Sequence, residues 1–188
     1  MPIRPQLQKI LDDAQDIRGK ANTKLRKLTP NQLMWSPTAE KWPIAVVLDH
    51  LNKCHTLTIP RFEEALKEAK QAGEERDVVI PHRFMDRVFL KLFGGSAPIQ
   101  IPVPPMFEPD PKPNPKQAVS QFFALHDEFE KVVKKSDDYQ LTKLRVISPV
   151  TERVKVSYIT YLEIQVLHEA YHWQQMDWLT KQIDFPKK

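Results

Sequence analysis

The sequence predicts an all-α fold, a four-helix bundle with a long proline-rich crossover between its second and third helices. Four segments repeat apolar residues at three- and four-residue steps, the period of a helix with one buried face. Eight of the 17 prolines lie between Pro98 and Pro115, where neither a helix nor an interior strand can continue. A chain of 188 residues has the length of one domain, so residues 1–188 are expected to form a single helical-bundle domain.

The first two expected helices cover residues 7–28 and about 43–70. The first carries one apolar stripe and is closed by Thr29-Pro30. The second begins at Pro43, because proline suits the first turn of a helix. Pro60 falls inside it and is expected to kink or split it, since proline lacks the backbone N–H that the helix needs.

The other two expected helices cover about residues 117–135 and 157–181, and Ser157 is the expected N-cap of the last one. A short amphipathic helix is expected around residues 84–93. The weak alternation over residues 144–156, around a Ser-Pro pair, indicates a small hairpin.

The proline-rich segment, residues 98–115, is expected to be extended and polyproline-like. We interpret it as a rigid strap over the bundle, with Met106 and Phe107 as its apolar anchors. A ligand for the aromatic groove of a partner protein is the alternative.

Composition excludes several classes of function. With 4 glycines the chain has neither a glycine-rich phosphate loop nor a dinucleotide fingerprint, and it has no G-x-S-x-G nucleophile elbow. The net charge of +4 is spread along the chain, so nucleic-acid binding is not expected. The single Cys54 excludes an internal disulfide, and the longest apolar run, residues 44–48, is too short for a membrane span. We therefore expect a cytoplasmic protein without membrane attachment.

The residues most informative about function are His168 and His172. Two histidines at i and i+4 lie about 40° apart around a helix, so both imidazoles can bind one cation at about 2.1 Å. With Glu169 they spell the H-E-x-x-H signature of zinc peptidases, in which the Glu is a general base. That class takes a third ligand downstream, but the 16 residues after His172 contain no His or Glu. A metallopeptidase is therefore a minor alternative.

A third ligand can come from upstream, and His50 is the best-placed candidate because it follows a buried apolar segment of the second helix. His50, His168 and His172 would form a facial set with open coordination positions. The alternative is that each histidine is only a hydrogen-bonded core residue. Cys54, one turn after His50, is either a small core residue or a supplementary soft ligand. His55 lies about 140° further around the helix than His50, so it is not expected to share the site.

Two motifs resemble those of the DinB/YfiT-like superfamily. Residues 42–51, WPIAVVLDHL, resemble the start of its second helix, with Pro43 and Val46 departing from the usual pattern. Residues 168–175, HEAYHWQQ, resemble its H-x-x-x-H-x-x-Q signature in the last helix. The resemblance covers nearly the whole chain in order and spacing. It implies a four-helix bundle whose divalent metal, such as zinc or nickel, is bound by His50, His168 and His172.

Members of that family include thiol-dependent S-transferases and a mycothiol-dependent isomerase. We therefore expect a metal-dependent enzyme of the S-transferase or hydrolase type, which activates a low-molecular-weight thiol or water toward a small-molecule substrate. Glu169 and Gln175 are the candidate catalytic residues. Glu169 is either a partner of the metal ligands or a surface ion-pair residue, and Gln175 either orients a ligand or bonds within the bundle. A non-catalytic metal- or small-molecule-binding bundle and a purely structural bundle are the alternatives, and the sequence is compatible with a homodimer.

Overall fold

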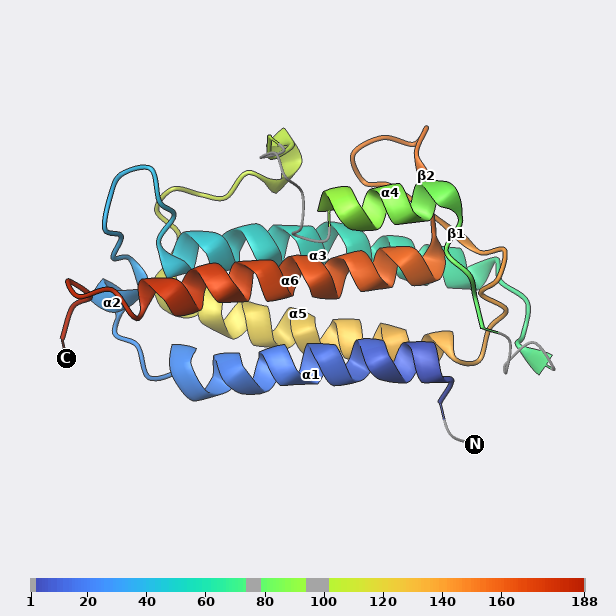
Figure 1. Ribbon diagram of the computed structural model, residues 1–188, viewed down its shortest axis with the longest axis horizontal. Helices are drawn as coiled ribbons and strands as arrows, with labels where there is room; N and C mark the ends of the chain where they lie inside the picture. The colour runs from blue at the N-terminus through green and yellow to red at the C-terminus, as the bar shows by residue number, and fades with distance from the viewer. Residues whose placement is uncertain (1–2, 74–78, 94–101, 188) are drawn as a thin grey trace.

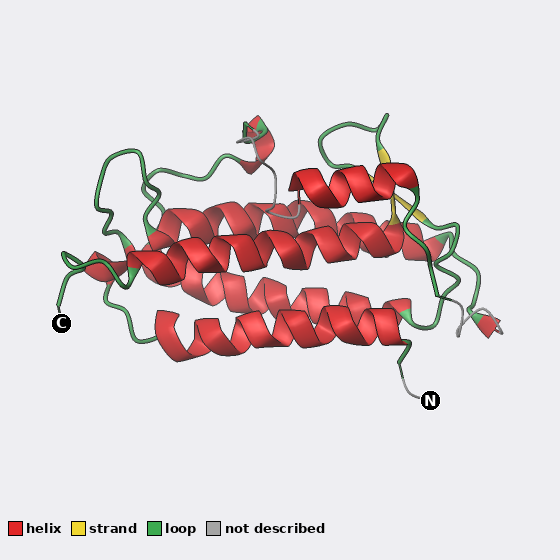
Figure 2. Ribbon diagram, in the orientation of Figure 1, coloured by secondary structure: helices red, strands yellow, loops and turns green. Residues whose placement is uncertain are grey.

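The computed structural model describes residues 3–73, 79–93 and 102–187. Their fold is mostly helical, with one small two-stranded sheet (Figures 1 and 2). The prediction of a helical protein is therefore confirmed. In the described part of the chain, no helix combines the length and the apolar character needed to cross a bilayer.

Four long helices lie side by side along the long axis of the molecule (Figure 1). They are α1 (Pro5–Leu25), α3 (Ile44–Lys67), α5 (Pro115–Ser136) and α6 (Tyr158–Leu179). Helices α5 and α6 each pack against both α1 and α3. The predicted apolar stripes are the faces that these contacts bury.

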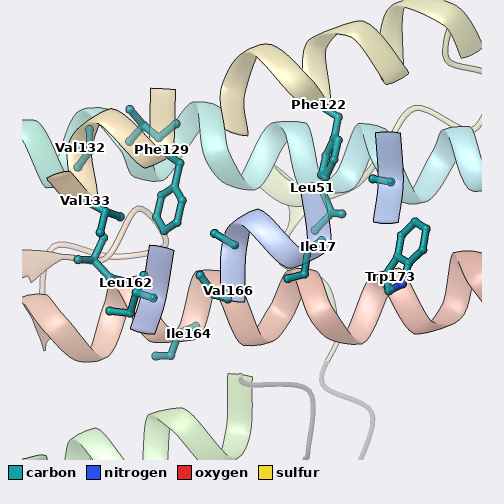
Figure 3. Close-up of a cluster of buried hydrophobic side chains, with 14 of the residues drawn as sticks. Ile17, Leu51, Phe122, Phe129, Val132, Val133, Leu162, Ile164, Val166 and Trp173 are labelled. Carbon is teal, nitrogen blue, oxygen red and sulfur yellow. The ribbon is translucent and has the colours of Figure 1, made fainter. Parts of the chain in front are cut away.

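The core lies between these four helices, and Figure 3 shows part of it. Ile17 of α1, Leu51 of α3, Phe122 of α5 and Val166 of α6 are all buried there. Burying one such side chain stabilises the fold by about 1.5–3 kcal/mol. The helices are thus held mainly by apolar packing, and a polar group between them needs a partner within the protein.

The structure differs from two expectations about the ends and continuity of the first two long helices. Helix α1 ends at Leu25, and Thr29 begins the short helix α2 (Pro30–Leu33) instead of only closing the first. The Thr29 hydroxyl accepts a hydrogen bond from the backbone N–H of Gln32, whose side chain accepts one from Thr29, so the two form a capping box. Of the two effects expected of Pro60, a kink or a split, the split is wrong, because α3 continues past Pro60 to Lys67.

The two smaller predicted elements lie in different connections: the short helix is between α3 and α5, and the hairpin is between α5 and α6. Helix α4 (Phe84–Phe93) packs against α6, and β1 (Arg145–Ile147) pairs antiparallel with β2 (Lys155–Ser157). Ser157 directly precedes α6, but its side chain does not cap that helix. It donates a hydrogen bond of 2.6 Å to the buried Asp86 carboxylate of α4 instead. The side chain of Ser157 therefore ties α4 to the start of α6.

The proline-rich segment is described from Pro102 onward, and residues 98–101 of the predicted strap lie outside the described residues. One short 3-10 turn, η2 (Pro105–Phe107), interrupts its extended path near α3. Met106 is 41% exposed and is therefore not the apolar anchor that was expected. Backbone groups hold the segment instead: Lys53 donates to the Glu108 carbonyl at 2.7 Å, and Asp49 accepts from the Asp110 N–H at 2.8 Å.

Candidate metal centre

The first histidine of the candidate site comes from α3. Val47, Leu48 and Leu51 are buried in the core, and this fixes the face of α3 that points inward. His50 lies among them in sequence and is 4% exposed. Its Nδ1 atom lies 2.8 Å from the carbonyl oxygen of Phe107. A carbonyl can only accept, so Nδ1 carries the proton and Nε2 of a neutral His50 keeps its lone pair.

The other two histidines come from consecutive turns of α6. The Nε2 atoms of His168 and His172 are 3.0 Å apart, and Nε2 of His168 is 3.4 Å from Nε2 of His50. The three sequence-predicted metal-ligand candidates thus come together, with one nitrogen of each within 4.8 Å of the others. In the described part of the chain they form the one cluster of three or more potential ligand side chains that is this tight.

Gln175 lies beside this cluster, as the spacing along α6 predicted. Its Oε1 atom is 2.8 Å from Nδ1 of His172. The amide oxygen accepts the Nδ1 proton, so Nε2 of His172 is also left as a lone-pair donor. Two of the three imidazoles therefore have their ligating nitrogen selected by a hydrogen bond on the opposite ring atom, which is how metal-binding histidines are oriented in proteins.

Burial and crowding keep the three imidazoles neutral. Burial lowers the pKa of His50, and it lowers that of His168 well below the ordinary value, with the neighbouring His172 and His50 adding to the effect. The pKa of His172 falls to about 4, mainly through burial and secondly through His50. A proton is thus disfavoured where three neutral nitrogens converge. This donor set suits a divalent cation such as zinc or nickel, which binds imidazole well.

Cys54 lies next to the cluster. Its Sγ atom is 3.8 Å from Nε2 of His50, and the side chain is buried. Burial, and secondly the charge of Glu169, raise the pKa of the thiol to about 12. Without a metal the sulfur is therefore a neutral, buried thiol that packs beside His50.

Glu169 is in the interior of the protein, so the alternative of a surface ion pair is wrong. It is 1% exposed, and one of its oxygens contacts Nε2 of His55. The other oxygen lies 3.2 Å from Nε2 of His126. Burial acts to raise the pKa of this carboxyl, but His55 and His126 outweigh it and hold the pKa well below the ordinary value. Glu169 is therefore a buried carboxylate between two imidazoles.

Sequence reasoning did not connect His55 and His126 with Glu169. The sequence excluded His55 from the metal site and identified no partner for His126, which is fully buried. A signal was present: His126 lies between Phe122 and Phe129 at helical spacing, on the apolar stripe of α5. A histidine on such a stripe needs a buried partner, but only the tertiary structure shows that the partner is on α6.

The remaining histidine is remote from the cluster. His82 contacts Thr160 and Glu163 at the other end of α6, at 3.0 and 3.1 Å. A cavity of about 500 Å³ lies between α3 and α5, and none of the three clustered histidines lines it. Among the described residues, the candidate metal ligands are therefore gathered in one location, where α3 and α6 meet beside the Phe107 carbonyl.

Comparisons with known proteins agree with the motifs. A family model described as the DinB superfamily matches residues 15–176. The match includes all three clustered histidines, Glu169 and Gln175. Searches of curated proteins and of solved structures found no match.

Proposed function

Because the chain belongs to the DinB superfamily, we propose that it binds a divalent metal through His50, His168 and His172 and that it is a metal-dependent enzyme of the S-transferase or hydrolase type. The single observation that carries the proposal is the convergence of three neutral imidazole nitrogens at 3.0 and 3.4 Å. A divalent cation held there would supply a Lewis-acid centre that lowers the pKa of a thiol or water beside it.

Other groups of the chain are suited to hold and orient the histidine ligands. The carbonyl of Phe107 and the amide of Gln175 keep the Nδ1 protons of His50 and His172, so each ring presents Nε2. We propose that Gln175 assists the reaction in this way, by positioning His172. Glu169, the other predicted catalytic residue, has its oxygens directed at His55 and His126. That position suits support of α6, and it is unsuited to the general base of an H-E-x-x-H peptidase, so we do not propose a peptidase.

We further propose that the scaffold is the predicted four-helix bundle, with residues 1–188 as one domain. The packing of α5 and α6 against both α1 and α3 supports this arrangement. The proposed crossover between α3 and α5 contains α4 and the strap. We also propose that the protein is cytoplasmic and acts on a small molecule. A low-molecular-weight thiol would be one co-substrate.

The first test is the metal content of tag-free protein by elemental analysis. We expect about one zinc or nickel ion per chain in the wild type and loss of the metal in His50→Ala and in His172→Ala, because two imidazoles bind far more weakly than three. His82→Ala is the matched control, since His82 lies outside the cluster, and it should keep the metal. Absence of metal from the wild type, even after incubation with zinc and with nickel, would overturn the proposed function.

The second test separates an enzyme from a binding protein. The metal-loaded wild type is mixed with a small thiol and an alkylating electrophile, and separately with simple esters and amides. The His172→Ala variant, which is expected to lack the metal, is treated in the same way. Consumption of one of these substrates by the wild type alone supports the enzyme. Bound metal with no consumption of any of them would favour the alternative, a non-catalytic metal-binding protein.

A further inference from the structure

A second polar cluster lies in the core, where three different helices meet. It consists of His55 from α3, His126 from α5 and Glu169 from α6, and all three side chains are at most 1% exposed. Aromatic rings surround it: Phe129 lies 5.3 Å from the His55 ring and Phe122 lies 5.6 Å from the His126 ring, between centroids. A carboxylate in such surroundings is unfavourable unless it is paired. Its two imidazole partners therefore fix where Glu169 can be.

This cluster is connected to the candidate metal centre through the chain itself. Glu169 occupies the same turn of α6 as His168, and the next turn carries His172. On α3, His55 directly follows Cys54, whose Sγ atom is 3.8 Å from Nε2 of His50. Successive residues of a helix are about 100° apart around its axis. When Glu169 is held toward α3 and α5, the direction in which the His168 side chain points from α6 is therefore also set.

The negative charge of Glu169 also acts on the histidines of the candidate site. Glu169 directly follows His168 in the chain and lies three residues before His172, and it is 1% exposed. A buried negative charge this near attracts a metal cation bound between these histidines. In a buried site this interaction is screened less than it would be at the surface.

We propose that Glu169, clamped by His55 and His126, is a positioning residue for the three-histidine site: it fixes the rotation of α6 against α3 and provides a buried negative charge that strengthens cation binding. The inference rests on the proposed function, because it requires that the three histidines bind a metal. It assigns a role to two histidines, His55 and His126, that lie outside the ligand set.

The test compares zinc dissociation constants, measured by competition with a zinc-binding dye, for the wild type and Glu169→Gln. Gln keeps the size of the side chain but removes its charge, and we expect binding about 10- to 100-fold weaker, the range found when partners of metal ligands are removed. Glu163→Gln is the matched control, since Glu163 is on the same helix and contacts His82 instead of the cluster. Urea unfolding of the metal-free proteins is measured in parallel.

A second pair of variants covers the case in which Glu169→Gln does not fold. His126→Leu removes one partner of the carboxylate, whereas His126→Gln keeps an N–H donor in its place. We expect several-fold weaker zinc binding in His126→Leu and recovery toward the wild-type value in His126→Gln. Lower stability with unchanged zinc affinity in these variants would show a purely structural cluster and overturn this inference alone. A wild type that binds no zinc or nickel would overturn the proposed function and this inference together.

Discussion

At the scale of single residues, the state of each imidazole is set by what its Nδ1 atom contacts and by how deeply the ring is buried. His50 and His172 donate from Nδ1 to oxygen atoms 2.8 Å away, which leaves Nε2 free of a proton. Burial then disfavours the charged ring, so a second proton does not occupy the lone pair. The same two causes that make these rings poor proton acceptors make them suitable ligands for a metal.

The lowered pKa values predict how the stability of the metal-free protein depends on pH. The pKa of His172 is about 4 in the fold, against 6.5 for an unperturbed histidine. Below pH 6.5 the unfolded chain therefore binds more protons than the folded one, so stability is fully present above that pH and is lost as the pH falls toward 4. A shift of this size corresponds to about 3 kcal/mol over the window.

The measurement is urea unfolding in the presence of a chelator at about pH 7 and about pH 5. His172→Gln keeps a polar group of similar size but cannot titrate, so its free energy of unfolding should decline less steeply than that of the wild type between the two pH values. The carboxylates titrate alike in both proteins, and their effect is removed by the comparison. An equal decline in the free energy of unfolding of the wild type and of His172→Gln would contradict the prediction.

At the scale of elements, α6 has different chemistry on different sides. One side presents His168 and His172 toward α3, and a neighbouring side presents Glu169 toward His55 and His126. The strap adds a further element, because its Phe107 carbonyl holds His50. It is fixed to α3 by Asp49 and Lys53, which also pair with each other at 3.2 Å.

This attachment predicts that Asp49→Ala weakens metal binding without removing a ligand. The Asp110 N–H and Lys53 both lose a partner, so the Phe107 carbonyl is held less firmly and His50 is oriented less well. We expect zinc binding about three- to tenfold weaker, less than for a direct partner of a ligand. Asp16→Ala removes an exposed carboxylate that pairs with Lys20 on α1 and should leave zinc binding unchanged. A dye-competition titration in which both variants match the wild type would contradict this role of the strap.

At the scale of the whole molecule, a buried ion pair joins the start of α1 to the end of α5. Arg4, just before α1, contacts the Asp137 carboxylate at 3.0 Å and also donates to the carbonyls of Asp137 and Tyr139, after α5. Both charged side chains are almost fully buried. This contact fixes the start of α1 to the end of α5, far from the histidine cluster in sequence.

Removal of this pair should reduce global stability. Arg4→Ala withdraws the guanidinium from a buried carboxylate, and we expect the free energy of unfolding to fall by about 3–5 kcal/mol. Lys9→Ala breaks an exposed pair with Asp13 on α1 and should change it by about 0.5 kcal/mol or less. Urea unfolding monitored by circular dichroism checks both, and similar effects of the two substitutions would contradict the distinction.

The sequence by itself determined the helices and two of the three candidate ligands. Apolar periodicity predicts the long helices because it reports one buried face directly, and the i, i+4 spacing of His168 and His172 brings two imidazoles together within a single helix. The short helix at residues 84–93 and the hairpin within residues 144–156 were also predicted, and the structure confirms them. These features depend on neighbours a few residues apart.

Only the tertiary structure decided which groups meet across helices. The sequence made His50 the best candidate for the third histidine. The 3.4 Å distance between its Nε2 atom and Nε2 of His168 depends on how α3 and α6 pack. Glu169 between His55 and His126, and the Phe107 carbonyl on His50, join residues from separate elements. Helical periodicity tells which face of each helix is buried, but the relative rotation and sliding of the helices are set by packing over the whole core.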